Sequence, residues 1–453
     1  MPRLFGTDGV RGTANVDLTP EFALQVSSAA AAVLAEAGAF GTHRPRAVVG
    51  RDPRASGEFL GAAVIAGLAA SGVDVIRVGV VPTPGIAYLV NDLDADLGVM
   101  LSASHNPAPD NGIKFFARGG VKLDDDLEDD IESRIGQSGH RPVGDGVGRV
   151  TTDFGATEAY VAHLVASLGE AGSLEGLKVV IDAANGAAYQ TAPAAFAAQG
   201  AEVVMINASP DGLNINRDCG STHPEALQEA VVAYGADLGI ALDGDADRCL
   251  AVDANGVLVD GDQIMAILAL AMKADRTLHS DTVVATVMSN LGFMQAMKRN
   301  GVAVDVTKVG DRYVLEAMNA NGFTLGGEQS GHVIMSEFAT TGDGVLTALH
   351  LAAQVVRSGR PLSELASVMT RFPQVLLNVS GVNKSRAGID PEVNAAVTAA
   401  AKELGDSGRV LLRPSGTENL VRVMVEAETS ERAHEIAERL AGVVLRRLSL
   451  DPR

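Results

Sequence analysis

The sequence predicts an α/β protein built from three repeated α/β domains and a smaller C-terminal α+β domain. Two patterns predict it: a strand–helix–strand succession that occurs three times before residue 372, and three strands with a terminal helix after it. A βαβ unit joins parallel strands through a helix, so its repetition favours mixed, mostly parallel sheets with helices on their faces. We therefore expect domains at residues 1–160, 161–260, 261–372 and 373–453.

Each repeat begins with an apolar strand, continues through a glycine-bearing loop and an alanine-rich helix that stops at glycine, and ends with a second strand. The paired strands are expected at 47–50 and 73–76, at 178–181 and 203–206, and at 283–284 and 302–304. In the last domain, strands are expected at 374–379, 409–412 and 420–425, followed by a helix over 430–448 with apolar residues at helical spacing.

The composition describes a globular protein without a general affinity for polyanions. Of 453 residues, 47% are hydrophobic, and 36 basic against 56 acidic side chains give a formal net charge of −20. A chain this acidic does not bind nucleic acid or an anionic membrane through its overall field.

Its cysteines and apolar segments point to a reducing, aqueous compartment. Cys219 and Cys249 are too few for a disulfide framework, and the N-terminus lacks the apolar core of a signal peptide. The apolar run 264–272 is too short to span a bilayer. We expect a cytoplasmic protein with no nucleic-acid or membrane partner.

The segment 243–248, with the sequence DGDADR, is the strongest candidate for a metal site. Asp243, Asp245 and Asp247 alternate with small residues, so a curled backbone can direct all three carboxylates at one cation. Oxygen ligands favour Mg²⁺, Ca²⁺ or Mn²⁺ over zinc, and the loop lacks the Gly and Glu positions of an EF-hand. The alternative is a solvated acidic turn, but the apolar strand expected at 238–242 favours a buried site.

A second candidate is the segment 102–107, with the sequence SASHNP, which follows an apolar strand at 97–101. Ligands bind at the carboxyl ends of strands in open α/β sheets, so Ser102 and Ser104 lie where a ligand is expected. No Gly-x-Ser-x-Gly elbow is present, and such a segment taken alone is more typical of an ordinary turn.

Two further polar loops could bind a ligand. The segment 326–332 places an acid, a hydroxyl and an imidazole between glycines, which suits a hydroxylated ligand or an ordinary glycine-rich turn. The segment 413–419, with Arg422 beyond it, offers guanidinium, hydroxyl and free amide groups that suit a phosphate dianion, the alternative being a polar hairpin turn. The glycine-rich segment 5–12 is not accompanied by a Walker A or dinucleotide fingerprint, so nucleotide binding has no support.

Taken together and in this order, the motifs at 104–107, 243–248, 327–332 and 413–417 resemble those of the α-D-phosphohexomutase superfamily. The resemblance covers essentially the whole chain. It implies four domains around a central cleft that holds the active site.

Within the superfamily, the segments 5–12, 110–116, 216–225 and 326–332 are most similar to the bacterial branch that acts on glucosamine phosphates. This resemblance implies interconversion of glucosamine 6-phosphate and glucosamine 1-phosphate, a step toward UDP-N-acetylglucosamine and peptidoglycan precursors. Ser104 would carry a phosphoryl group as phosphoserine and exchange it with the sugar through a bisphosphorylated sugar intermediate. The implied partners are a sugar phosphate and a second copy of the chain.

The resemblance also implies roles for individual residues. One Mg²⁺ per chain would be held by Ser104, as its phosphoserine oxygen, and by Asp243, Asp245 and Asp247. The catalytic candidates beside the moving phosphoryl group are Lys114 and His332 as general acid and base, with Arg11 and Arg248.

Substrate binding is implied for two loops. Glu328 and Ser330 would bind sugar hydroxyls in either orientation of the sugar. The non-reacting phosphate would be held by Arg413, Ser415, Gly416, Thr417 and Arg422. Basic residues in or beside these loops would offset the acidic total, including Arg51 and Arg54 after the first strand.

Three other functions share some of these motifs. A phosphomannomutase or phosphoglucomutase of the same superfamily has every catalytic motif. A metal-dependent sugar phosphatase would use the acidic loop without a stable phosphoserine, and a sugar-phosphate sensor would keep the binding loops without the catalytic serine or aspartates, all of which are present.

Overall fold

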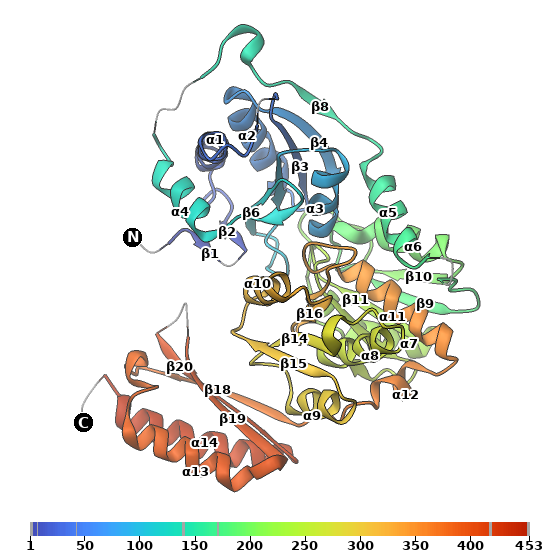
Figure 1. The fold of residues 1–453 in the computed structure, drawn as a ribbon, viewed down its shortest axis with the longest axis vertical. Coiled ribbons are helices and arrows are strands. Elements are labelled where there is room, and N and C mark those ends of the chain that lie inside the picture. The colour runs from blue at the N-terminus through green and yellow to red at the C-terminus, as the bar shows by residue number, and fades with distance from the viewer. Residues whose placement is uncertain are drawn as a thin grey trace. The chain divides into compact units, whose positions relative to one another are not determined.

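The computed structural model describes residues 3–6, 8–41, 43–137, 141–169, 172–415 and 419–450. The chain forms two compact units, Met1–Met288 with Gly301–Val368, and Ser289–Asn300 with Met369–Arg453. The first unit holds three α/β sheets, and the second holds one antiparallel sheet (Figure 1). The expected fold class is confirmed, while the four domain boundaries stay a prediction.

The first sheet has the strand order β1-β2-β6-β5-β3-β4-β8, with β7 paired to β6. Its strands are β1 (Phe5–Gly6), β2 (Gly9–Thr13), β3 (Arg46–Arg51), β4 (Asp74–Val80), β5 (Leu97–Leu101), β6 (Asp110–Ala117), β7 (Val121–Lys122) and β8 (Val150–Thr152). Its helices are α1 (Pro20–Glu36), α2 (Ser56–Ala70), α3 (Thr83–Asp92) and α4 (Asp125–Arg134), and α5 (Ala156–Ser167) leads to the second sheet. Strand β3 runs parallel to β4 and β5, and β6 runs antiparallel to β5 and β2.

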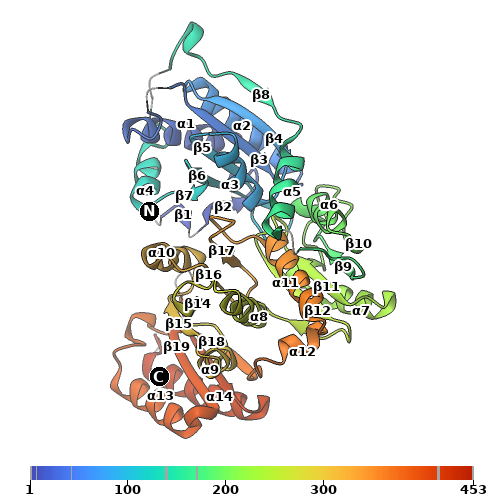
Figure 2. The same ribbon diagram turned by 45° about the vertical axis from the view of Figure 1, so that its right-hand side comes forward.

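Alternation of side chains across the first sheet places helices on both faces. Val49, Val99 and Phe115 belong to a core shared with α1, α2 and α4. On the opposite face, a side chain at Gly98 would collide with Val90 of α3, so this glycine permits a close helix–sheet contact (Figure 2).

The second sheet has the order β10-β9-β11-β12-β13. Strands β10, β9 and β11 are parallel, and β12 pairs antiparallel with both β11 and β13. Its elements are β9 (Lys178–Asp182), α6 (Thr191–Ala198), β10 (Glu202–Ile206), α7 (Glu225–Tyr234), β11 (Leu238–Leu242), β12 (Cys249–Asp253) and β13 (Leu258–Val259). The continuous apolar run at β11 is buried along its whole length, as expected for a central parallel strand.

The third sheet has the order β15-β14-β16-β17. In chain order, this region forms α8 (Gly261–Ala274), β14 (Thr282–Thr286), α9 (Leu291–Arg299), β15 (Ala303–Thr307), α10 (Asp311–Asn321), β16 (Leu325–Gly327), β17 (Val333–Met335), α11 (Gly344–Ser358) and α12 (Leu362–Ala366). Helix α9 belongs to the second compact unit. The three expected strand pairs are confirmed as the parallel pairs β3–β4, β9–β10 and β14–β15.

The antiparallel sheet of the second unit has the order β18-β20-β19, formed by β18 (Gln374–Ser380), β19 (Gly408–Pro414) and β20 (Leu420–Ala427). Helices α13 (Pro391–Leu404) and α14 (Ser430–Leu448) cover one face of it and share its core (Figure 1). The expected strands and terminal helix of this region are confirmed. Short 3₁₀ helices occur at Gly144–Gly146, Ala187–Tyr189, Gly220–Thr222, His279–Asp281, Lys384–Arg386 and Gly405–Ser407.

Three of the candidate loops lie at the carboxyl ends of sheet strands. Residues 102–109 follow β5, residues 243–248 follow β11, and residues 328–332 connect β16 to β17. In the described part of the chain, none of the helices combines the length and apolarity needed to cross a lipid bilayer.

His350 on α11 makes folding sensitive to acid. Its Nε2 lies 3.1 Å from Ser167 Oγ, and burial, aided by the charge of Arg357, lowers the pKa of His350 to about 4. In the unfolded chain the His350 ring has a pKa near 6.5, so between about pH 6.5 and pH 4 it is protonated in the unfolded state but neutral in the folded state. The contribution of the buried neutral ring to the free energy of unfolding is therefore lost as pH falls from about 6.5 to about 4.

We expect the His350→Gln variant to lose less stability than the wild type between pH 6.5 and pH 4. Urea unfolding midpoints measured across this range test it, with His434→Gln as the control because His434 is exposed on α14. A wild-type-to-variant difference that stays constant with pH would contradict the assignment.

Candidate active site

The three loop aspartates converge as their spacing predicts. Asp243, Asp245 and Asp247 are all buried, and one carboxylate oxygen from each lies within 4.8 Å of the other two. The chain curls here because Ala246 takes a left-handed conformation, with φ of 56°.

The carboxylate chemistry of this loop fits a hard divalent cation. Asp245 Oδ1 and Asp247 Oδ1 are buried, and among the described residues neither has a hydrogen-bond partner. Burial raises the pKa of Asp243 well above its usual value, and the charges of Asp247 and Asp245 add to this rise. A bound cation removes this repulsion and gives the two orphaned oxygens a ligand role.

Ser104 lies directly against this cluster. Its side chain is buried, and its Oγ donates a hydrogen bond to Asp243 Oδ2 at 2.5 Å. The backbone of Ser104 is left-handed, with φ of 51°, and its N–H donates to Ser102 Oγ at 2.9 Å. A non-glycine residue held in this region signals a constraint imposed by its surroundings.

Gly244 makes the approach of the two loops possible. A Cβ atom at this position would lie 2.6 Å from the carbonyl oxygen of Ser104, closer than real Cβ contacts. The glycine between the first two aspartates is therefore required by the serine loop and not only by the turn itself.

The serine loop is held from behind by a fully buried arginine, Arg54. Its Nε donates to Asp52 Oδ2 at 2.9 Å, and its two terminal nitrogens donate to backbone carbonyls of the serine loop. The four carbonyl acceptors belong to Ser104, Asn106, Pro107 and Asp110. We expected Arg54 to contribute charge beside the cleft; instead its guanidinium is enclosed in the protein and fixes the loop that carries Ser104.

Two residues from other segments, neither of them a predicted site residue, hold the same loops. Asn216, with φ of 57°, donates through Nδ2 to the carbonyls of Ser104 and Asn106 at 2.8 and 3.0 Å. Thr83, at the start of α3, donates through Oγ1 to Asp245 Oδ2 at 2.5 Å. Asn216 stands in a segment singled out for its resemblance, whereas nothing in the Pro-Thr-Pro sequence around Thr83 marked it.

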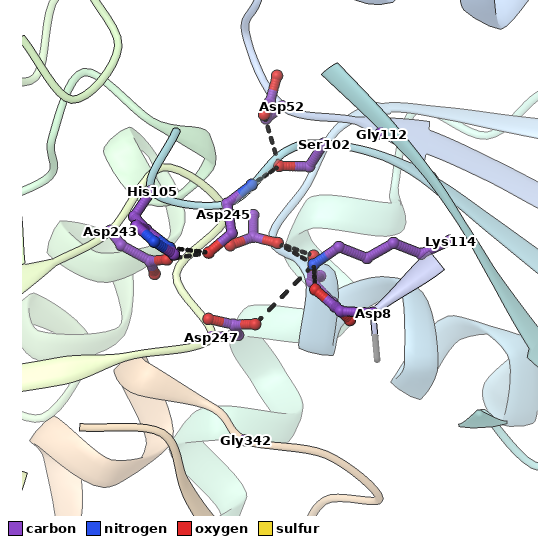
Figure 3. Close-up of polar contacts among 12 residues, drawn as sticks. Asp8, Asp52, Ser102, His105, Gly112, Lys114, Asp243, Asp245, Asp247 and Gly342 are labelled. Atoms are coloured by element: carbon purple, nitrogen blue, oxygen red, sulfur yellow. Dashed lines mark hydrogen bonds and ion pairs between the residues drawn. The ribbon is translucent and has the colours of Figure 1, made fainter. Parts of the chain in front are cut away.

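Lys114 on β6 points into the acidic cluster. Its Nζ lies 2.7 Å from Asp245 Oδ2, 2.6 Å from Asp8 Oδ2 and 3.9 Å from Asp247 Oδ2 (Figure 3). Burial alone would lower the pKa of Lys114, but the charges of Asp245 and Asp8 raise it above its usual value, so the side chain remains an ammonium. Asp8 was read only as part of a glycine-rich motif, and it is the second anchor of this lysine.

His332 lies on the other side of the cluster. Its Nδ1 is 3.7 Å from Asp247 Oδ2, and its Nε2 accepts a hydrogen bond from the N–H of Gly342 at 3.2 Å. Burial disfavours the charged ring, but the contact with Asp247 and the charge of Asp311 raise the pKa of His332. With Nε2 accepting this bond, the neutral ring carries its proton on Nδ1, the nitrogen that faces Asp247.

A pocket of about 440 Å³ opens beside these groups. It is lined by Leu4, Gly6, Asp8, Gly9, Arg11, His105, Asp247, Arg248, Val309, Gly310, Asp311, Glu328 and His332. The Nε atoms of Arg11 and Arg248 are buried and have no hydrogen-bond partner among the described residues. Two guanidinium groups with unfilled donors suit an anionic ligand.

The glycine-rich loop contributes two more polar groups. Glu328 Oε1 accepts a hydrogen bond from the N–H of Gly310 at 3.0 Å, which fixes this carboxylate at the pocket wall. Ser330 Oγ is buried and, within the described ranges, has no hydrogen-bond partner.

The candidate phosphate loop belongs to the second compact unit. Arg413 on β19 lies directly opposite Arg422 on β20, so both side chains share one face of the sheet. Burial and the charge of Arg422 lower the pKa of Arg413, and such like-charged neighbours favour an anion between them. Lys384 Nζ donates to the Ser415 carbonyl at 2.9 Å, and Gly416 and Thr417 lie outside the described residues.

The structure thus brings together the expected site residues of the first unit. These are Ser104, Lys114, Arg11, Arg248, His332, Glu328, Asp243, Asp245 and Asp247.

Comparison with known proteins assigns every part of this arrangement to one family. The chain matches phosphoglucomutase/phosphomannomutase alpha/beta/alpha domain I at residues 2–141, domain II at 158–256, domain III at 260–372 and the C-terminal domain at 376–443. A protein of Cutibacterium acnes named phosphoglucosamine mutase is 68% identical over 450 residues, covering 99% of this chain and 100% of the relative. One of Thermobifida fusca with the same name is 62% identical, with 100% of both chains covered.

Solved structures share the fold. A phosphoglucomutase/phosphomannomutase family protein of Burkholderia thailandensis matches with a TM-score of 0.82 at 24% identity, covering 99% of this chain and 98% of its own. The N-acetylphosphoglucosamine mutase of Aspergillus fumigatus, crystallised with GlcNAc-6P and magnesium, matches with a TM-score of 0.66 at 19% identity, covering 97% and 95%.

The role of Arg54 predicts a local effect of its replacement. Lysine keeps the charge but cannot present five directed donors, so we expect Arg54→Lys to destabilise the serine loop by about 3 kcal/mol, roughly a hundredfold in amide exchange. Hydrogen–deuterium exchange of residues 102–110 measures this. The neighbouring Arg51→Lys is the control because Arg51 is partly exposed, and equal exchange in the two variants would refute the role.

Proposed function

The chain belongs to the phosphoglucomutase/phosphomannomutase family, and we propose that within it the protein interconverts glucosamine 6-phosphate and glucosamine 1-phosphate. It is an isomerase-type phosphotransferase. The observation that carries the proposal is the burial of Ser104 Oγ 2.5 Å from Asp243, within a carboxylate triad, in a chain with full-length identity to phosphoglucosamine mutases.

Ser104 would act as a phosphoserine. The bond between phosphorus and the serine oxygen breaks as a bond forms from phosphorus to the free sugar hydroxyl, whose proton passes to a base, and the released serine oxygen takes up a proton. The resulting sugar bisphosphate reorients in the site and returns its other phosphoryl group to Ser104, whose hydroxyl gives up its proton to a base while an acid protonates the sugar oxygen that is released. The bisphosphate is therefore both the intermediate and the compound that reloads the serine.

The metal proposal follows from the donor set. Asp243, Asp245 and Asp247, with an oxygen on Ser104, would hold one Mg²⁺ per chain. A magnesium ion there neutralises charge on the phosphoryl group during transfer. The orphaned oxygens of Asp245 and Asp247 support this assignment.

The proton-transfer roles are divided by the local charges. Lys114 remains an ammonium between Asp245 and Asp8, which suits a proton donor and a partner for phosphoryl oxygens. His332, whose Nδ1 faces Asp247, would be the second acid–base group. Arg11 and Arg248, with unfilled donors beside the pocket, would bind phosphoryl oxygens.

Sugar and phosphate binding complete the proposal. Glu328 and Ser330 would bind sugar hydroxyls, since one lines the pocket and the other has an unfilled buried hydroxyl. Arg413 and Arg422, with Ser415, Gly416 and Thr417, would hold the non-reacting phosphate. We also propose a cytoplasmic location, supply of precursors for UDP-N-acetylglucosamine, and a homodimeric assembly.

The test is a side-by-side assay of glucosamine, glucose and mannose 6-phosphates, combined with intact-mass analysis. We expect the highest kcat/KM for glucosamine 6-phosphate and a fraction of the chain heavier by one phosphoryl group at Ser104. Ser104→Ala should lower turnover by at least about a thousandfold, because it removes the hydroxyl that would carry the phosphoryl group.

Ser133→Ala, an exposed serine on α4, is the matched control and should retain both turnover and the mass shift. Preference for mannose or glucose 6-phosphate would overturn the substrate assignment. Full turnover of Ser104→Ala would overturn the phosphoserine mechanism.

A further inference from the structure

The ammonium group of Lys122 is enclosed between two carboxylates that come from distant parts of the chain. Lys122 lies at the end of β7, and its Nζ bonds Asp8 Oδ1 at 2.9 Å and also Asp311 Oδ2. Burial opposes its charge, but Asp311 and Asp8 raise the pKa of Lys122 above its usual value. The group is therefore a fixed cation between two anions.

The first anion, Asp8, orients one side of the site. Its Oδ2 lies 2.6 Å from Lys114 Nζ and 2.5 Å from Arg11 Nη2, while Oδ1 is occupied by Lys122. Burial alone would raise the pKa of Asp8, but Lys114, Lys122 and Arg11 lower it well below its usual value. Removing Lys122 would free one oxygen of the carboxylate that fixes Lys114.

The second anion, Asp311, orients the opposite side. It is the first residue of α10, directly after Gly310, whose N–H binds Glu328. Asp311 Oδ2 also lies 3.7 Å from His332 Nε2. The start of α10 therefore sets the positions of both Glu328 and His332 at the pocket wall, and Figure 2 shows α10 beside β7 and α4.

We propose that Lys122 is a positioning residue of the reaction: by joining Asp8 to Asp311, it fixes Lys114, beside the carboxylate triad, relative to His332 and Glu328 at the pocket wall. Lys122 itself does not line this pocket, so it acts through the two carboxylates. The expected effect on kcat rests on the proposed function. The expected effect on the positions of the side chains rests on the geometry alone.

A second set of ion pairs also anchors α10, in this case to α4, and supplies the matched control. Arg312, also on α10, binds Glu128 Oε2 on α4 at 3.0 Å and contacts Asp125. It links α10 to α4 without touching Asp8 or Asp311 through its side chain. If Lys122 only anchored α10 to neighbouring parts of the fold, Arg312→Gln would lower kcat as much as Lys122→Met does.

The kinetic test compares Lys122→Met, Lys122→Arg and Arg312→Gln on the hexose 6-phosphate that the wild type converts fastest. We expect Lys122→Met to lower kcat by about 10- to 100-fold, the scale of a misplaced catalytic group, with KM changed less than about threefold. Lys122→Arg should recover most of kcat, and Arg312→Gln should stay within about threefold of wild type. Unchanged kcat in Lys122→Met, or an equal loss in Arg312→Gln, would overturn the proposal.

A double-mutant cycle tests the route of the effect. If Lys122 acts partly through Asp311, then Lys122→Met should lower kcat by a much smaller factor in an Asp311→Asn background than in the wild type. Full additivity of the two changes would contradict the coupling.

A readout without substrate separates this inference from the proposed function. Lys122→Met should accelerate amide exchange at Gly310, the donor to Glu328, while Lys122→Arg should not. A wild type without mutase activity would reject the proposed function, whereas unaltered Gly310 exchange in Lys122→Met would reject the positioning role.

Discussion

A single hydrogen bond, from Ser104 Oγ to Asp243 Oδ2, joins the two loops on which the proposed chemistry depends. It can form only because the serine loop approaches the metal loop closely enough that a side chain at Gly244 would collide with it. Arg54 and Asn216 fix the carbonyls of the serine loop, and this over-determination holds Ser104 in a left-handed conformation. Phosphoryl transfer depends mainly on positioning and charge, so a site fixed in this way is suited to it.

Pairing of charges within the site explains how a chain with a net charge of −20 can bind anionic substrates. Two lysines pair with three of the carboxylates at the site: Lys114 contacts Asp8 and Asp245, and Lys122 contacts Asp8 and Asp311. The matched pairs leave the unfilled guanidinium donors of the pocket wall, and a bound divalent ion at the triad, to bind phosphoryl oxygens. Local pairing, and not the overall charge, decides what the pocket binds.

The parts of this site that depend on interactions between residues close in the sequence could be predicted, whereas the parts that depend on distant segments could not. Three aspartates within five residues and a continuous apolar strand before them are local signals, and both the triad and strand β11 were predicted correctly. The strand before it made the segment of Ser104 a candidate, but only the resemblance distinguished that segment from an ordinary turn. No local sequence pattern encodes the burial of Arg54 or the ion pair between Lys122 and Asp311 of α10. Both depend on tertiary contacts between segments that are distant in the sequence.

The central claim is that the serine and the three aspartates form one cation site. The most direct measurement is anomalous diffraction from crystals of the protein soaked in Mn²⁺, recorded at the manganese edge. The account predicts a single strong peak within coordination distance of an oxygen from Asp243, Asp245, Asp247 and Ser104. A triad without a peak in crystals that bind manganese elsewhere, or a peak at the triad out of reach of Ser104, would contradict it.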